Sequence, residues 1–170
     1  PRRGPTFVTK KIVQGLVRIK MGLQKKLTLG NLYALRDWGH AKDYAIAMWK
    51  ILQYKKPDDF VIASGKQITV RKFLTKTLDL LNIKYNWKKD AKSEKVIISK
   101  DHKIFKNIIK GKIIVSTSSK YLRPLEVSNL KGDSSKARKL LKWKPKITLE
   151  KMITEMIREE FKKLDFNVEI

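Results

Sequence analysis

The feature that most constrains the fold is an uninterrupted apolar run from Phe60 to Ala63, which Ser64-Gly65 closes. Such a run is typical of a strand buried on both faces, as the strands of a parallel sheet are. Apolar residues recur every three or four positions on both sides of it, in residues 40–53 and 69–81. This spacing predicts two helices, so the pattern favours an α/β fold with a parallel sheet.

The rest of the chain continues this mixed order. Thr6 is a candidate N-cap for a helix over 7–21, and Thr69 and Thr148 are candidate N-caps for later helices. The predicted helices and strands, in chain order, are helix 7–21, strand 26–29, helix 40–53 with an apolar face of Tyr44, Met48, Ile51 and Leu52, strand 60–63, helix 69–81, strands 95–98 and 112–115, a helix capped by Asp133 and stopped by Pro145, and a last helix from Thr148. No internal repeat or low-complexity linker appears, so we expect residues 1–170 to form a single region.

The residue types present exclude several kinds of chemistry. The chain has no cysteine, which excludes disulfides and catalytic thiols, and its two histidines, His40 and His102, lie far apart in sequence. We therefore expect no metal site. No apolar stretch approaches the roughly 20 residues that span a bilayer, and no secretory segment follows the first residues, so we expect a cytoplasmic protein. The start at Pro1 suggests a piece whose upstream part is missing.

The charge balance raises the possibility of a nucleic-acid partner. The chain carries 40 Lys and Arg against 16 Asp and Glu, a formal charge of +24. A basic chain is the electrostatic signature of a nucleic-acid binder. However, only 8 of the basic residues are Arg, and the lysines are spread over almost every predicted element. Solvated lysines are the favoured interpretation, and a basic nucleic-acid-binding module is kept as an alternative.

No catalytic or cofactor motif is evident in the residues themselves. The eight glycines form no glycine-rich strand-to-helix turn, and no phosphate loop ends in Gly-Lys-Ser/Thr. A Tyr-x-x-x-Lys pair occurs at Tyr85 and Lys89. About one such match is expected by chance among five tyrosines in so lysine-rich a chain. We interpret Tyr85 as a strand or loop residue and assign no catalytic residue.

Two short segments combine an arginine with an acid. In the segment from Arg36 to His40, a guanidinium beside Asp37 can bind a phosphate, while Asp37 fixes the turn. In the segment from Tyr121 to Val127, Pro124 favours an extended Arg123, and Glu126 can accept hydrogen bonds from a diol or a base edge. The alternatives are a structural Arg36 and a surface ion pair between Arg123 and Glu126, and the residues alone leave these open.

At these same residues the sequence resembles the C-terminal half of the GDP-mannose 4,6-dehydratases, which are NADP-dependent nucleotide-sugar enzymes of the extended short-chain dehydrogenase/reductase superfamily. The matching strings, in the family's order, are Pro1 to Gly4 with Thr6 to Lys11, Leu29 to Leu32 with Arg36 to Tyr44, Asp59 to Gly65, Tyr121 to Val127, Gly132-Asp133 with Lys136-Ala137, and Leu141 to Pro145.

The resemblance implies part of a superfamily fold: an incomplete Rossmann-type sheet plus a small substrate-binding α/β region. It implies that the NADP-binding N-terminal part, with the catalytic Thr or Ser, Glu and Tyr-x-x-x-Lys, precedes Pro1. It also implies GDP-mannose as substrate and a homo-oligomer, dimer or tetramer, for the intact enzyme. Arg3 and its neighbour Arg2 resemble the family's NADP-contacting arginine loop. The positions that resemble the family's GDP contacts are Val8, Lys11, Arg36, Arg123 and Glu126.

The chain departs from the family mainly in residues 84–120. The family usually has a Gly- and Glu-rich turn there, and an Asp-Pro before the arginine of the GDP site, whereas this chain has lysine-rich sequence and Ser118-Ser119. A free-standing nucleotide-sugar or oligomer-contact domain without catalysis is therefore a further alternative.

Overall fold

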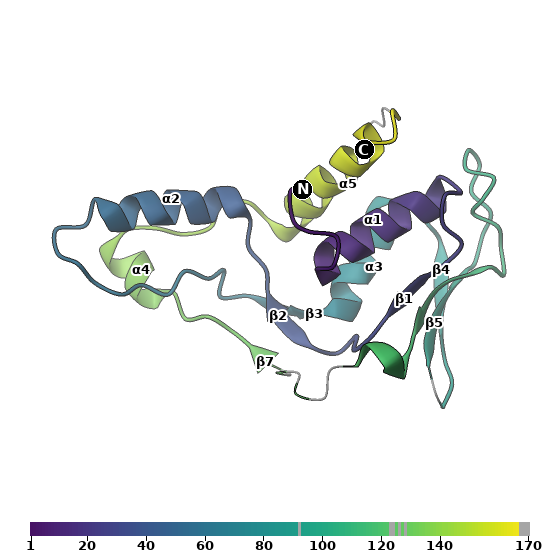
Figure 1. Cartoon of the computed structure of the whole chain (residues 1–170), viewed down its shortest axis with the longest axis horizontal. Coiled ribbons are helices and arrows are strands. Elements are labelled where there is room, and N and C mark those ends of the chain that lie inside the picture. Colours follow the sequence, from purple (N-terminus) through teal and green to yellow (C-terminus); the bar gives the residue numbers. More distant parts are fainter. Residues whose placement is uncertain (92, 123–124, 126, 128, 167–170) are drawn as a thin grey trace.

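The chain folds into five α-helices and seven short strands over its described residues, as a computed structural model shows (Figure 1). The structure describes residues 1–91, 93–122, 125, 127 and 129–166. The elements are α1 Val8–Lys20, β1 Leu27–Leu29, β2 Leu35–Asp37, α2 Ala41–Leu52, β3 Gln67–Thr69, α3 Val70–Leu80, β4 Tyr85–Lys89, β5 Glu94–Ile98, β6 Ile113–Thr117, the 3-10 turn η1 Ser119–Tyr121, β7 Asn129–Leu130, α4 Ser135–Leu140 and α5 Leu149–Lys162.

The strands form two mixed sheets. One has the order β1-β6-β5-β4, in which β1 and β6 are parallel and the other pairs antiparallel. The other has the order β3-β2-β7, in which β2 runs parallel to β7 and antiparallel to β3. The predicted α/β class is confirmed. That the described residues form a single region stays a prediction.

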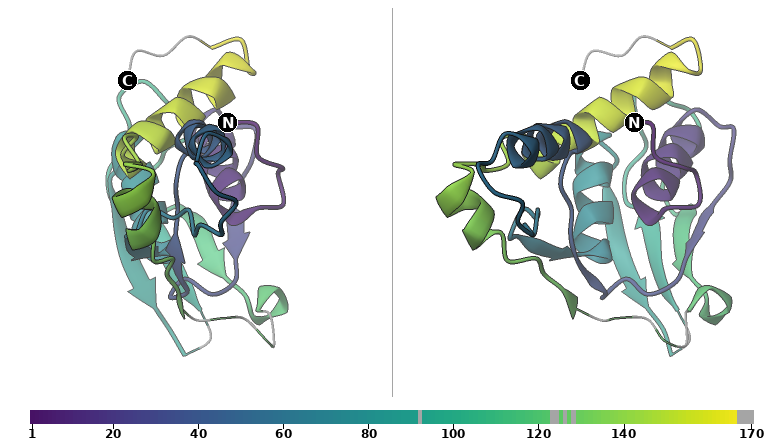
Figure 2. Two further views of the ribbon diagram at one scale, coloured as in Figure 1. Left: turned by 90° about the vertical axis from the view of Figure 1, so that its left-hand side faces the viewer. Right: turned by 60° about the vertical axis from the view of Figure 1, so that its left-hand side comes forward.

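The main core lies between the four-stranded sheet and the helices α1, α3 and α5, which gather beside it (Figure 2). The apolar stripe of α1 is buried because it recurs at helical spacing, with Ile12, Leu16 and Ile19 fully covered. Gly15 fits this stripe because a Cβ there would lie only 3.0 Å from the side chain of Leu27. The small residue thus lets α1 approach β1 closely.

A second, smaller cluster joins α2 to α4. Ala47, Ala137, Leu141 and Trp143 are buried in it, and the segment that leaves α2 packs alongside. In Figure 1 α2 and α4 extend to one side of the main core. Among the described residues, no helix combines the length and the apolar character that crossing a bilayer requires.

Several predictions from the pattern are confirmed. The helices α1, α2, α3 and α5 and the strands β5 and β6 lie where periodicity placed them. Thr69 and Thr148 are N-caps, and their hydroxyls accept from the N–H groups of Lys72 at 3.1 Å and Lys151 at 3.2 Å. Thr6 is not a cap, because α1 begins after Phe7 without a side-chain cap bond. The prediction that Asp133 is the N-cap of α4 is also wrong, because Ser134 holds that position, although Asp133 accepts the N–H of Ser135 at 2.9 Å.

The predicted strand from Phe60 to Ala63 is wrong. The segment has no strand structure, and Val61 is 56% exposed. A strand exists only through hydrogen bonds to a neighbour, and none of the described strands pairs with this segment. Phe60 and Ile62 instead pack against the smaller cluster, and Ala63 is buried, so most of the run is covered without forming a strand.

The predicted apolar face of α2 is split between two environments. Tyr44 and Ile51 are half-buried against the smaller cluster, as expected. Met48 and Leu52, in contrast, are 64% and 80% exposed. A helix that is apolar on two sides is normally buried on both. The described part of the chain thus leaves one apolar side of α2 uncovered.

Candidate functional site

Asp37 joins the strand that carries Arg36 to the apolar segment that follows α2. Its carboxylate accepts the N–H of Ser64 at 3.0 Å and the N–H of Gly65 at 2.7 Å. Gly65 has a φ of +75°, a conformation that an L side chain rarely adopts. Asp37 therefore fixes a turn at residues 64–65, which are distant in sequence, whereas the sequence predicted that it fixes the turn of its own loop.

His40 holds the start of α2 against α5. Its Nδ1 accepts the N–H of Lys42 at 3.1 Å as the N-cap, so the ring proton belongs on Nε2, which donates to Glu155 Oε2 at 3.0 Å. Burial raises the pKa of the Glu155 carboxyl, but the attraction of His40 and Lys42 outweighs it and leaves this pKa below its ordinary value.

Asp43 ties α2 to the segment before α5. One carboxylate oxygen accepts the N–H groups of Lys146 at 3.0 Å and Ile147 at 2.9 Å. The Asp43 carbonyl accepts the indole N–H of Trp143 at 2.9 Å. Because Asp43 is only 3% exposed, these bonds are made in a place that water does not reach. Asp43, like Asp37 and His40, therefore has a structural role in this loop and helix start.

Trp38 and Gly39 shape the same loop through packing. The Trp38 ring lies 5.0 Å from the ring of Phe73 on α3. A Cβ on Gly39 would lie 2.3 Å from the Tyr44 hydroxyl oxygen, so a larger residue would displace the Tyr44 ring. The loop from Arg36 to Tyr44 is thus packed against α3 and its own helix, and Arg36 extends from the paired strand β2.

Arg36 reaches the segment that contains the second predicted arginine. Its Nη1 donates to the Val127 carbonyl at 2.7 Å and to the Leu35 carbonyl at 2.8 Å. The parallel pairing of β2 with β7 brings the two segments together. Arg123 and Glu126 lie outside the described residues, but both belong to the segment that ends at Val127.

Lys11 meets this segment near its start. The Lys11 ammonium lies 4.3 Å from the centre of the Tyr121 ring, over its face. Gly30 lets the backbone of Tyr121 lie close to the end of β1, since a Cβ on residue 30 would lie 2.3 Å from the Tyr121 carbonyl oxygen. Val8, one turn before Lys11 on α1, is half-buried against the main core. The structure thus places Lys11 and Arg36 on elements that contact opposite ends of residues 121–127.

Arg2 and Arg3 lie at a different place, on the rim of a cavity. Both are exposed, and the Arg3 guanidinium lies 4.2 Å from the centre of the Phe7 ring. The cavity has a volume of about 770 Å³ and is also lined by Lys42 and Glu155. Basic and acidic side chains therefore line the same cavity.

Tyr85 and Lys89 do not form a catalytic pair. Both lie on the strand β4, where residues four apart are separated by about 13 Å. The Tyr85 hydroxyl lies 3.2 Å from Asp79 Oδ1 and donates to it. The interpretation of Tyr85 as a strand or loop residue is confirmed.

Sequence reasoning missed three buried charged residues, Lys10, Lys20 and Glu160. Lys10 and Glu160 form an ion pair between α1 and α5, and both are about 4% exposed. Lys20 donates to the Leu81 carbonyl at 2.8 Å, under the ring of Phe105. The only available signal was that Lys10 and Lys20 fall on the side of α1 that also carries apolar residues, because their partners lie 61 to 150 residues away.

One protein family matches most of the chain by sequence. The family described as GDP-mannose 4,6 dehydratase matches residues 1–156. A GDP-mannose 4,6-dehydratase of Vibrio cholerae is 44% identical over 163 residues, which cover 95% of this chain and 44% of that protein. GDP-mannose 4,6 dehydratase 1 of Arabidopsis thaliana is 45% identical over 160 residues, which cover 94% of this chain and 37% of that protein. The chain spans less than half the length of these relatives.

Solved structures support the fold. RMD from Pseudomonas aeruginosa, complexed with NADPH, gives a TM-score of 0.71 at 16% identity, covering 96% of this chain and 45% of that one. The dTDP-glucose 4,6-dehydratase of Bacillus anthracis, in complex with NAD, gives a TM-score of 0.62 at 19% identity, covering 96% of this chain and 41% of that one. The chain therefore shares its fold with part of each of these two enzymes.

Proposed function

This chain belongs to the GDP-mannose 4,6-dehydratase family, and on that premise we propose that it is the substrate-binding half of an enzyme converting GDP-mannose to GDP-4-keto-6-deoxymannose with tightly bound NADP. The observation that carries the proposal is the placement of Lys11 and Arg36 at the two ends of residues 121–127. Arg123 and Glu126 lie between those ends in sequence. Two guanidinium groups and one ammonium suit a nucleoside diphosphate.

The proposed role of these residues is binding and orientation. Arg36 lies on the paired strand β2, and its guanidinium already donates to the Val127 carbonyl. Little reordering of the side chain is therefore needed when a phosphate oxygen replaces that carbonyl as the acceptor. Glu126 is proposed to accept from the guanine or ribose, as the resemblance implies. Val8 is proposed as a packing contact at the start of α1. Holding the nucleotide in one pose aligns the hexose for reaction.

The cofactor is proposed to meet this chain through Arg2 and Arg3. Exposed guanidinium groups on the rim of a cavity of about 770 Å³ suit the phosphates of a dinucleotide. Residues 1–170 contain no glycine-rich strand-to-helix turn, so the other cofactor contacts belong to the part of the relatives that this chain does not match. The reaction oxidises C4 of the hexose, eliminates water across C5 and C6 and reduces C6. When bound, NADP would supply the redox chemistry: it would accept one hydride from C4 and return it to C6.

The uncovered side of α2 is proposed to contact that same amino-terminal part. Met48, Trp49 and Leu52 expose more than half of their surfaces there. The apolar segment from Phe60 to Ala63, which has no strand partner among the described residues, is proposed to pair with a strand of the same part. A homo-oligomer and a cytoplasmic location, as expected from the sequence, stay predictions.

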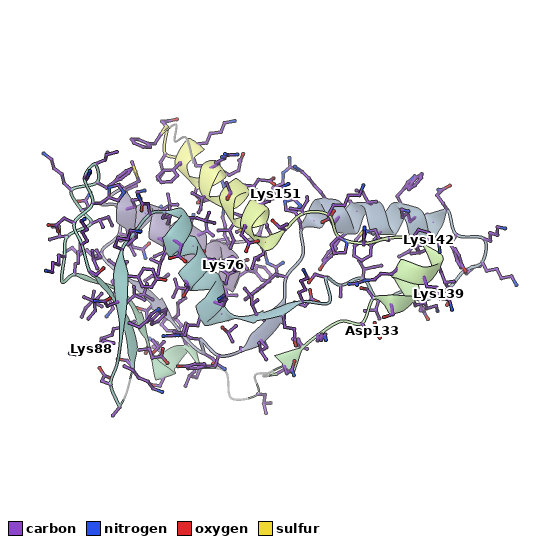
Figure 3. All side chains as sticks on the ribbon, turned by 180° about the vertical axis from the view of Figure 1, so that it is seen from behind. Lys76, Lys88, Asp133, Lys139, Lys142 and Lys151 are labelled. Carbon is purple, nitrogen blue, oxygen red and sulfur yellow. The ribbon has the colours of Figure 1, made fainter. Side chains whose placement is uncertain are left out.

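The lysines support a solvated surface over a nucleic-acid interface. Figure 3 shows labelled lysines on four elements along the whole length of one view: Lys76 on α3, Lys88 on β4, Lys139 on α4 and Lys151 on α5. Lys76 is moreover paired with a carboxylate, that of Glu150. A sequence-independent polyanion site concentrates its basic residues on one face or groove, which this distribution does not favour.

Calorimetric titration of GDP-mannose tests the substrate site. The protein is this chain joined to the amino-terminal part of the Vibrio cholerae relative, carrying Arg36→Ala or Arg123→Ala. A charge-assisted hydrogen bond to phosphate contributes roughly 1.5–3 kcal/mol, so each variant should bind about 10–100 times more weakly. Lysine at either position keeps the charge without the planar fork and should recover part of the loss.

Arg18→Ala is the matched control, since Arg18 is an exposed arginine near the end of α1. It removes the same charge and should leave the affinity unchanged. If both Ala variants bind as tightly as the parent, the two arginines are structural and the proposed substrate site is wrong.

A further inference from the structure

The buried ion pair between α1 and α5 has an additional partner. Lys10 contacts Glu160, and about 95% of each side chain is buried. The Lys10 ammonium also donates to the Pro1 carbonyl at 3.1 Å. Lys163 lies 3.3 Å from the same Glu160 oxygen but is more than half exposed. Burial raises the pKa of the Glu160 carboxyl, while its bonds to Lys10 and Lys163 outweigh this and leave the pKa lowered.

The Pro1 carbonyl belongs to the segment that carries the two arginines of the cavity rim. Arg2 and Arg3 follow Pro1 directly, and Phe7 ends the segment, where its N–H donates to the Gly4 carbonyl at 3.2 Å. The Arg3 guanidinium rests on the Phe7 ring. The segment is therefore held at one end by its own turn and at the other by Lys10.

An ion pair is a poor choice if the only need is to pack α1 against α5. Removing two charges from water costs more than a well-packed apolar pair would, and such replacements are often neutral or stabilising. An ammonium, however, has three N–H donors and can bond two acceptors in fixed directions at once. The use of Lys10 at this buried place is thus explained by the second acceptor, the Pro1 carbonyl.

We propose that Lys10 is a positioning residue that joins the Pro1 carbonyl to Glu160 and thereby fixes Arg2 and Arg3 on the rim of the cavity. The ligand that these arginines then meet is anionic, and its identity as NADP rests on the proposed function. The anchoring itself does not, because the two helices and the segment make these contacts without ligand.

Limited trypsin digestion of the 170-residue chain, followed by mass spectrometry, tests the anchor. Trypsin needs an extended stretch of chain around the bond that it cuts, so the rate of cleavage after Arg3 reports how often the segment opens, and the loss of residues 1–3 is read directly from the intact mass. Lys10→Met removes the bond to the Pro1 carbonyl and should speed this cleavage about tenfold. Cleavage after Lys89, in the distant β4, is the internal reference and should keep its rate.

A second variant separates anchoring from stability. In Lys10→Met with Glu160→Leu, an apolar pair replaces the ion pair, so the helices stay packed while the donor to Pro1 is absent. This chain should keep its thermal midpoint and still lose residues 1–3 about ten times faster than the parent. Lys10→Arg keeps a donor and should restore protection.

Lys163→Met is the matched control, because it removes a Glu160 partner that is not bonded to Pro1 in the described structure. It should leave cleavage after Arg3 unchanged. If the double variant is as protected as the parent, or if Lys163→Met opens the segment equally, the anchor is wrong. Should Lys10→Met simply unfold, cleavage after Lys89 rises too, and the double variant decides. If the anchor is intact and the chain joined to the amino-terminal part of the Vibrio cholerae relative binds no NADP, the proposed function alone is refuted.

Discussion

The uncovered side of α2 leads to a quantitative prediction about the isolated chain. Ile46, Met48, Trp49 and Leu52 are 46%, 64%, 61% and 80% exposed. Fully burying one such side chain contributes roughly 1.5–3 kcal/mol, so covering this face is worth about 4–7 kcal/mol. A contiguous apolar face of this kind marks an interaction surface or an aggregation risk. We therefore expect the chain on its own to be poorly soluble and to self-associate through α2.

The charge of the chain opposes this association, and salt decides the balance. At +24 the copies repel one another, but at about 0.15 M salt the Debye length is only about 8 Å. Short-range apolar contact should then prevail over repulsion. Self-association should accordingly strengthen as salt rises, which is opposite to the behaviour of an ionic interface.

Leu52→Glu is the decisive change. It removes the most exposed of these apolar side chains and places a charge where an interface would bury it, at a cost of at least about 2–3 kcal/mol. Self-association should weaken by roughly 30–100 fold, as measured by sedimentation velocity over a concentration series. The thermal midpoint should not fall, because Leu52 makes few contacts in the folded chain.

Leu23→Glu is the control, since it makes the same substitution at an exposed leucine in the turn after α1. It should leave sedimentation unchanged. The reasoning fails if the parent chain is a monomer at every concentration with one sharp, cooperative thermal transition. It fails equally if Leu23→Glu and Leu52→Glu act alike.

Three further outcomes are expected. Asp43→Ala should lower the free energy of unfolding by about 2–4 kcal/mol in urea titration, because the N–H groups of Lys146 and Ile147 lose a charged acceptor; an unchanged midpoint would contradict the role given to Asp43. Burial lowers the pKa of Lys20 below its ordinary 10.5, so the unfolded chain binds more protons there, and the free energy of unfolding should rise with pH between the lowered pKa and 10.5. Lys20→Met should flatten that rise, and an equal slope in both chains would refute the assignment. The isolated chain should not convert GDP-mannose to the keto sugar when NADP is added, as read by chromatography of the nucleotide sugars, because no general acid and base are assigned within it.

The amphipathic helices could be predicted because their signal is local. In α1, α3 and α5 the apolar residues that face the core lie within one or two turns of each other, so spacing alone reports which side is buried. The caps at Thr69 and Thr148 follow the same logic, since the hydroxyl bonds an N–H three residues away. The segments that carry Arg36 and Arg123 were singled out from their residue types, and the family resemblance then implied that they contact the nucleotide.

Pairing between distant segments was decided only by the tertiary structure. The strands β2, β3 and β7 have two or three residues each, too few for a pattern, and form because residues 30 to 94 positions apart come together. The run from Phe60 to Ala63 shows the converse: an apolar pattern states that a segment is to be buried, but a strand also needs a neighbour to bond. Lys10 could not be interpreted from sequence for the same reason. Whether a buried charge is tolerable depends on its partner, and Glu160 lies 150 residues away.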